Sequence, residues 1–158
     1  VQLGAGRIND IDSEVRMTLD ALVSHDDVHV VLGESMLGER LNISLERVHT
    51  VRDYPNSVYF RAFDATILAG GYNSYHEVRH ASMPALFYPN METGIDDQLA
   101  RCNVAVTEGW GSVLETRSKE SITQAVDKLL SNIGTIEGSS FESGAWPLAR
   151  QLASRLKS

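Results

Sequence analysis

The chain alternates short apolar segments of strand length with stretches whose apolar residues repeat at helical spacing. Ala65-Thr66-Ile67-Leu68 is apolar and partly β-branched, as expected of a buried strand. Ser118 is the predicted cap of a helix over 119–130, in which Ile122, Val126 and Leu129 share one apolar stripe. This alternation predicts an α/β fold with a mostly parallel sheet and helices on both of its faces.

The 158 residues, of which 42% are apolar, suit one domain with one core. We expect this domain to span 1–132 and to be followed by a Gly/Ser-rich loop over 133–145. Residues 146–158 then form a last helix with Leu148, Leu152 and Leu156 on one face, which packs either on this domain or on another one. The expected strands lie at 1–3, 28–32, 48–51, 65–68, 84–89 and 105–107, and shorter helices lie near 36–45 and 56–62.

The turn after the strand at 65–68 carries the most information about function. Its sequence, Ala69-Gly70-Gly71-Tyr72-Asn73-Ser74-Tyr75-His76-Glu77, places two glycines, two small polar residues and a carboxylate where a strand becomes a helix. Glycines let the backbone approach a ligand closely, and the first turn of a helix offers unpaired N–H groups with about half a positive charge. The segment therefore predicts an anion-binding turn.

A plainer interpretation of the same turn is a capping box. Ser74 and Glu77 fit its S-x-x-E pattern, in which both side chains only satisfy N–H groups of their own helix. A second segment favours a ligand site, because the predicted strand at 84–89 leads to Asp96-Asp97-Gln98 at the start of another helix. Two neighbouring strands would deliver polar groups to one edge of the sheet. The two aspartates would otherwise be ordinary charges that complement a helix dipole.

These residues resemble the donor-binding signature of GT-B glycosyltransferases. The resemblance covers the G-W-N-S-x-x-E … P … D/E-Q box of plant-type enzymes and the C-terminal domain of the bacterial lipid-intermediate N-acetylglucosaminyltransferases. In coarse form it runs from Val1 to about Leu130, and it implies a Rossmann-like domain that is one half of a GT-B fold. The positions that match are Gly71-Tyr72-Asn73-Ser74, Glu77, Pro84, Pro89 and Asp97-Gln98.

The resemblance also implies a role for each matched position. In the family, the glycine and small polar residues bind the donor diphosphate, the glutamate holds the ribose and the acidic–Gln pair contacts the sugar. Ala69 stands where plant-type members carry a histidine, and because the bacterial enzymes also lack it, this alanine favours the bacterial branch. The implied contacts are diphosphate with Gly71, Asn73 and Ser74, ribose with Glu77, and sugar with Asp97 and Gln98.

A second glycine turn, Gly4-Ala5-Gly6-Arg7, follows the first predicted strand. Such a turn can begin a nicotinamide or flavin fingerprint, but Asn9 occupies its third glycine position. Gly33 stands where an acidic ribose-binding residue would end the second strand, so an oxidoreductase is disfavoured. By resemblance, Gly4, Ala5 and Gly6 face the diphosphate from the opposite side, and Arg7 either adds a charge-assisted contact or faces solvent.

The resemblance places the nucleotide base at the turn after the third strand, at Val51 and Arg52. Family members read uracil there through backbone groups, and Tyr54 either stacks on the base or is an ordinary turn aromatic. His76 and His80 stand at i and i+4 on one predicted helix without a third metal ligand. We expect no metal, no cofactor apart from the UDP-sugar substrate, and no catalytic residue within this chain.

Composition limits the partners. A net charge of −7 disfavours a nucleic acid, although a local positive site for a nucleotide is compatible with it. Cys102 is the only cysteine, so we expect no intramolecular disulfide and a packing role in a helix. The sequence has neither an apolar run of about 18 residues nor a signal peptide, so we expect no membrane span. The single cysteine favours a reducing cytoplasm, and any attachment to a membrane would come through the missing domain. The missing initiator Met suggests a piece of a longer chain.

The resemblance implies the donor-binding C-terminal domain of an inverting hexosyltransferase. A hexosyl or N-acetylhexosaminyl group would pass from a UDP-sugar to an acceptor bound by a missing N-terminal domain, which would also supply the general base. The isolated chain would then bind donor and catalyse little. Two alternatives are a stand-alone donor-binding subunit that works with a separate acceptor subunit, and a UDP-sugar epimerase of the same fold. A structural module without a ligand is a third.

Overall fold

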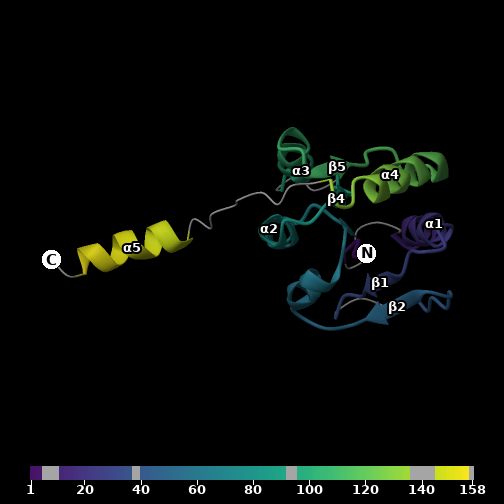
Figure 1. Cartoon of the computed structure of the whole chain (residues 1–158), viewed down its shortest axis with the longest axis horizontal. Helices are drawn as coiled ribbons and strands as arrows, with labels where there is room; N and C mark the ends of the chain where they lie inside the picture. The colour runs from purple at the N-terminus through teal and green to yellow at the C-terminus, as the bar shows by residue number, and fades with distance from the viewer. Residues whose placement is uncertain (5–10, 37–39, 92–95, 136–144, 157–158) are drawn as a thin grey trace.

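The computed structural model describes residues 1–4, 11–36, 40–91, 96–135 and 145–156, and it has the predicted α/β architecture. The helices are α1 (Ile11–Val23), α2 (Tyr72–Ala81), α3 (Gln98–Thr107), α4 (Lys119–Ser131) and α5 (Ala145–Arg155), with a 3-10 helix η1 (Asn56–Ala62). The strands are β1 (Val30–Gly33), β2 (Val48–Val51), β3 (Thr66–Leu68), β4 (Ala85–Phe87) and β5 (Gly111–Val113) (Figure 1).

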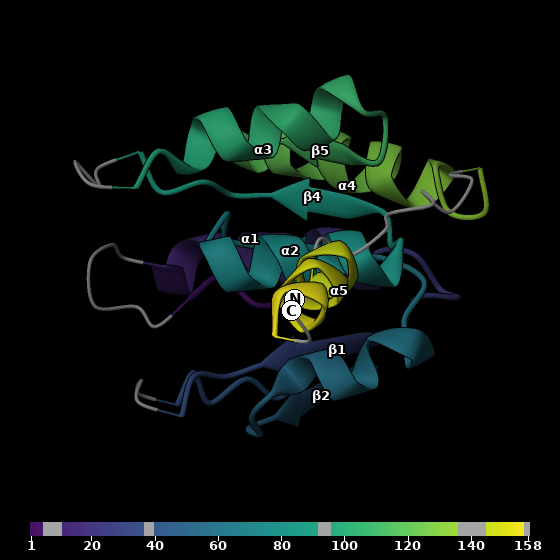
Figure 2. The same cartoon turned by 90° about the vertical axis from the view of Figure 1, so that its left-hand side faces the viewer.

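All the strand pairs are parallel: β1 pairs with β2, β3 pairs with β4, and β4 pairs with β5. Residues 1–3 join the two groups, because the Gln2 amide donates to the Ile67 carbonyl at 2.8 Å and the Gly33 amide donates to the Val1 carbonyl at 2.8 Å. The order across the sheet is therefore β2, β1, residues 1–3, β3, β4 and β5. This is the strand order of the doubly wound Rossmann fold. In Figure 2, β1 and β2 accordingly lie at one end of the molecule, and β4 with α3 and α4 at the other.

Helices cover both faces of the sheet, and neighbouring strand residues point to opposite faces. Ile67 and Leu86 belong to the core beneath α1 and α4, whereas Leu68 and Phe87 belong to the core beneath α2 and α3. Figure 1 shows α1 and α4 together on one side of the strands and α2 and α3 on the other. Both cores therefore pack against the same strands, each on a different set of their side chains.

Three local predictions were wrong or incomplete. The segment 105–107 is the last turn of α3, since Cys102 and Ala105 are both buried at helical spacing, and the last strand is β5 instead. Residues 40–45 of the expected helix over 36–45 are not helical. The helix after the glycine turn begins at Tyr72, so Gly71 is its N-cap and Ser74 lies inside its first turn. The capping-box interpretation therefore does not describe α2.

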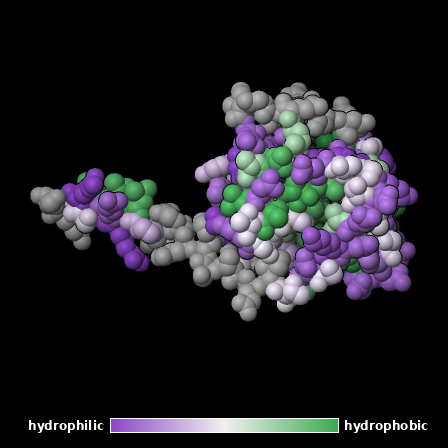
Figure 3. Space-filling view, turned by 90° about the horizontal axis from the view of Figure 1, so that it is seen from above, coloured by the Kyte–Doolittle hydropathy of each residue, from purple (hydrophilic) through white to green (hydrophobic). Residues whose placement is uncertain are grey.

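Some apolar side chains remain at the surface. Figure 3 looks onto the face where α3 lies and shows apolar atoms gathered there; α3 itself exposes Val104 and Val106. The predicted stripe of α5 is also exposed, at Leu148, Leu152 and Leu156. None of the helices in the described ranges has the length and apolar character that crossing a bilayer requires.

Candidate functional site

The strand order creates a topological switch point between residues 1–3 and β3. In doubly wound folds, ligands bind outside the carboxyl ends of the strands at this point, because the connections there lead away to opposite sides. Gln2 pairs with Leu68, and continuing this parallel register by two residues brings Gly4 beside Gly70. Gly4 has φ +101°, a left-handed conformation that favours glycine, and a Cβ added there would meet none of the described residues within 4 Å. Gly4, with which the first predicted glycine turn begins, thus lies at the same edge as the second turn.

Gly70 and Gly71 have different reasons to be glycine. A Cβ on Gly70 would collide with the Cys102 sulfur and would lie 3.3 Å from the Gln98 Cβ, so Gly70 lets α3 pack directly on the end of β3. A Cβ on Gly71 would come within 4 Å of no atom in the part of the chain that the structure describes. Packing therefore explains Gly70, whereas Gly71 leaves open space at the start of α2.

The first turn of α2 has the properties of an anion-binding helix end. Gly71 is the N-cap of α2 and has no side chain that could cap the helix. The first amide that bonds back into the helix is that of Tyr75, which donates to the Gly71 carbonyl at 3.0 Å. The amides of Tyr72, Asn73 and Ser74 precede this bond, and they carry the positive end of the helix dipole. Asn73 and Glu77 are exposed and stand at i and i+4, which is one face of α2.

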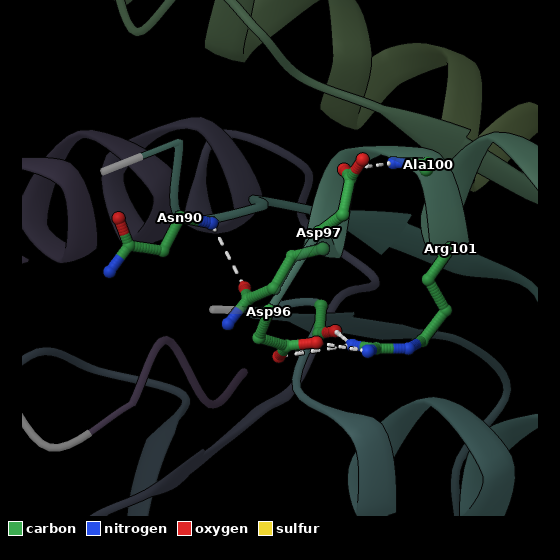
Figure 4. A network of polar contacts seen from close by, with 7 residues as sticks. Asn90, Asp96, Asp97, Ala100 and Arg101 are labelled. Carbon is green, nitrogen blue, oxygen red and sulfur yellow. Dashed lines mark hydrogen bonds and ion pairs between the residues drawn. The ribbon is translucent and has the colours of Figure 1, made fainter. Parts of the chain in front are cut away.

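The start of α3 places the predicted sugar-contacting pair beside this turn. Asp97 is the N-cap of α3, and its Oδ1 accepts from the Ala100 amide at 2.9 Å. The Gln98 Oε1 accepts from the Asn90 amide at 2.9 Å, which joins α3 to the end of β4. Figure 4 shows the Asp97 carboxylate turned toward Ala100. The alternative of a helix-end charge thus describes part of what Asp97 does.

Arg101 is a residue of this site that the sequence interpretation missed. Its Nη1 donates to the Gly70 carbonyl at 2.7 Å, and its guanidinium forms an ion pair with the Asp96 carboxylate (Figure 4). The hydrogen bond from Arg101 holds the pKa of Asp96 below its usual range. The guanidinium also lies 5.4 Å from the centre of the Tyr72 ring. Its one sequence signal was an arginine one turn after the Asp97-Gln98 pair, and a mid-helix arginine is ordinarily solvated.

The segment predicted to hold the base follows β2, at the far end of the sheet order. The Val51 carbonyl accepts from the Glu34 amide at 2.9 Å, and the Arg52 Nη2 donates to the Met36 carbonyl at 2.8 Å. Both contacts tie this turn to the end of β1. The following η1 packs against α2, so the chain returns from Arg52 to the helix that carries Glu77.

Histidine adds neither a metal site nor charge to this edge. His76 lies edge-on to Tyr72, and burial, together with Arg79 and Arg101, lowers its pKa, so it stays neutral at pH 7. In the portion of the chain that the structure describes, three or more His, Cys, Asp or Glu side chains nowhere gather as a metal site would require.

The structure thus brings Gly4, Gly71, Asn73 and Ser74 to one edge, with Asp97 and Gln98 next to them through Gly70. Glu77 stands one helical turn further along α2. Val51 and Arg52 lie across the sheet from them. Ala5, Gly6 and Arg7 fall outside the described residues. The contacts of these residues with a donor stay predictions.

Comparison with solved structures identifies the fold. A spinosyn rhamnosyltransferase, SpnG, complexed with thymidine diphosphate, superposes with a TM-score of 0.66 at 17% identity over 82% of this chain and 36% of that one. The calicheamicin glycosyltransferase CalG4 gives 0.62 at 22% identity over 81% of this chain and 32% of that one. The glycosyltransferase SnogD from Streptomyces nogalater gives 0.56 at 18% identity, over 96% and 41% of the two chains.

The chain therefore has the Rossmann-like fold of one half of a GT-B glycosyltransferase, as the sequence resemblance implied, and it spans about a third of the length of these enzymes. No protein-family model and no curated protein matches the sequence.

Proposed function

We propose that this chain is the donor-binding C-terminal half of a glycosyltransferase, which binds a UDP-sugar at the carboxyl edge of its sheet. The parent enzyme transfers a hexosyl or N-acetylhexosaminyl group to an acceptor held elsewhere. A fold shared with glycosyltransferases supports this class, and one of those enzymes was solved with a nucleoside diphosphate.

The observation that supports the proposal is that Gly4 and Gly71 lie at one edge of the sheet, next to the first turn of α2. Among the described residues, nothing lies within 4 Å of where a Cβ on Gly4 or Gly71 would stand, and the amides of the first turn of α2 follow directly after Gly71. A diphosphate has several oxygens that accept hydrogen bonds, and backbone N–H groups at a helix start are suited to them. The dipole of α2 offers positive potential although the net charge of the chain is −7.

The remaining contacts are those that the sequence resemblance implies. Glu77 accepts the ribose hydroxyls, the backbone at Val51 and Arg52 reads the base, and Asp97 with Gln98 contacts the sugar. Asp97 already caps α3 through Oδ1, so its Oδ2 is the oxygen that meets a sugar hydroxyl. The helix start and the glycine turns stabilise the diphosphate as it leaves, without a metal.

The acceptor and the general base belong to a further domain or to a separate subunit. The chain has about a third of the length of the enzymes whose fold it shares. Alone, it binds donor and turns over little.

Calorimetric titration tests the proposal directly. UDP and UDP-N-acetylglucosamine should bind, and titration with TDP tests which base the site prefers. Glu77→Gln should lower the affinity for UDP about tenfold by removing the ribose contact. Asp27→Asn is the matched control, because Asp27 is an exposed carboxylate before β1, at the opposite edge of the sheet. Absent UDP binding, or equal effects of the two variants, would refute the site. Transfer by the isolated chain at the rate of a complete enzyme would refute the division into halves.

A further inference from the structure

Arg101 makes three contacts that join separate parts of the site. One Nη1 bond reaches the Gly70 carbonyl at 2.7 Å, both terminal nitrogens contact the Asp96 carboxylate, and the guanidinium faces the Tyr72 ring. The Arg101 side chain is 18% exposed, whereas the Asp96 carboxylate is 37% exposed. Arg101 stands on α3, Gly70 ends the turn after β3, and Asp96 precedes α3.

Resting on the proposed function, we infer that Arg101 is a positioning residue for the donor diphosphate. It holds the Gly70–Gly71 peptide and the Asp96 carboxylate in the arrangement that the diphosphate requires, and it acts through them without touching the donor.

The first step of the argument concerns the peptide between Gly70 and Gly71. A trans peptide is planar, so its N–H points opposite to its C=O. Arg101 fixes the Gly70 carbonyl toward α3, and it thereby fixes the direction of the Gly71 N–H, which opens α2. Neither residue has a side chain that would restrict this peptide. The hydrogen bond from Arg101 therefore restricts the rotation of this peptide, which the two glycines alone leave free.

The second step concerns charge. Asp96 is a carboxylate close to the edge where we place two phosphates, and an unpaired carboxylate there would repel them. The ion pair with Arg101 compensates this charge. Figure 4 shows Asp96 facing Arg101 while the neighbouring Asp97 turns the other way to cap α3. The two adjacent aspartates thus have different partners: Asp96 pairs with Arg101, and Asp97 caps α3.

A matched control lies on the same pair of helices. Arg79 on α2 bonds the Glu108 carboxylate, just beyond the end of α3, at 2.7 Å, and its side chain is 24% exposed. This pair also links α2 to α3, but at the end of α3 far from Gly70. Arg79→Gln should therefore weaken packing to a degree similar to Arg101→Gln without changing the diphosphate turn.

The experiment is titration of UMP and UDP into four proteins: the unsubstituted chain, Arg101→Gln, Arg101→Lys and Arg79→Gln. The UDP-to-UMP affinity ratio is the readout, since a general loss of structure would weaken both nucleotides alike. We expect Arg101→Gln to lower this ratio about tenfold, Arg101→Lys to lower it less because the charge remains, and Arg79→Gln to leave it unchanged. Arg101→Lys also serves if the glutamine variant does not fold.

The double variant Arg101→Gln with Asp96→Asn separates positioning from charge compensation. A ratio that stays low in the double variant supports positioning of the Gly70–Gly71 peptide. Full recovery of the UDP-to-UMP ratio would overturn the positioning role, because the loss in Arg101→Gln would then come entirely from the uncompensated charge of Asp96. An equal fall for UMP and UDP, or the same fall in Arg79→Gln, would also overturn it. If the unsubstituted chain binds neither nucleotide, the proposed function itself fails.

Discussion

Gly70 lies directly against the sulfur of Cys102, so the backbone of the turn after β3 packs closely on the buried face of α3. This contact sets the distance between the two helix starts that form the candidate site. It also separates two glycines that look equivalent in the sequence, since Gly71 next to it faces open space. Substitution at the two positions should therefore have opposite consequences for stability and for binding.

Gly70→Ala should destabilise the fold. Its Cβ would overlap the sulfur of a buried, short side chain and crowd the Gln98 Cβ, and overpacking of this kind costs about 1–3 kcal/mol. Urea unfolding followed by circular dichroism measures the loss. The pair Gly70→Ala with Cys102→Ala should recover part of it, because the sulfur is then gone. A single variant as stable as the parent would contradict the close packing.

Gly71→Ala should leave the fold nearly unchanged and weaken UDP. The residue has φ −60°, which alanine adopts, and the added methyl would meet no non-neighbouring atom of the described residues within 4 Å, so the free energy of unfolding should change by less than about 1 kcal/mol. The methyl would occupy the space where we place the diphosphate, and we expect about a tenfold loss of UDP affinity by calorimetry. Undiminished UDP affinity would place the diphosphate elsewhere.

The sequence predicted the strands up to β4 well, because each of them has a local apolar pattern, whereas it placed the last strand wrongly. Ile67 and Leu68 make β3 apolar on both faces, as expected of a strand that is covered on two sides. Leu86 and Phe87 do the same for β4. The order of those strands across the sheet was reachable through the resemblance. The glycine turns were visible for a similar reason, since their residue types are unusual at the end of a strand.

What failed depended on contacts between distant segments. Ala105 looked like part of a β-branched strand, yet it is helical because its methyl packs against Gly111 on β5. Ser74 and Glu77 matched a capping box, but α2 starts three residues earlier than that pattern requires. Arg101 became part of the site only through the Gly70 carbonyl, 31 positions away in the chain. A local pattern cannot indicate such a partner.

The Cys102 thiol should be inert in the folded protein. Burial raises its pKa from 9.0 to about 12, so almost no thiolate exists at neutral pH. Alkylation by iodoacetamide at pH 8 should be undetectable by mass spectrometry in buffer and complete in urea. Rapid labelling of the folded chain would contradict the packing on Gly70.

The same shift gives a dependence of stability on pH. Above about pH 9 the unfolded chain loses the thiol proton while the folded chain keeps it, so the unfolded state binds fewer protons and the free energy of unfolding falls as pH rises. This contribution is fully present below pH 9. Between pH 8 and pH 10, the free energy of unfolding measured in urea should fall less for Cys102→Ala than for the parent. Equal falls would mean that Cys102 does not contribute.

Tyr88 should contribute a buried hydrogen bond between the end of β4 and α1. The Thr18 hydroxyl donates to the Glu14 carbonyl at 2.7 Å, so at 2.9 Å from Tyr88 it must accept from the phenol. Tyr88→Phe removes this donor and should lower the free energy of unfolding by about 1 kcal/mol. Tyr54→Phe, at a side chain that is 80% exposed, should have no measurable effect. Similar unfolding curves for the two variants would show that the Tyr88 bond adds nothing.

Ser118 should stabilise α4 as its N-cap, as the sequence predicted. Its Oγ accepts from the Ser121 amide at 3.2 Å, and α4 contributes Ile122, Val126 and Leu129 to the core. Ser118→Ala should lower the free energy of unfolding by about 1 kcal/mol, whereas Ser118→Asp should retain stability because aspartate is also a good N-cap and its charge complements the helix dipole. Urea unfolding at pH 7 distinguishes the two, and equal losses in both variants would show that the cap bond does not hold the helix start.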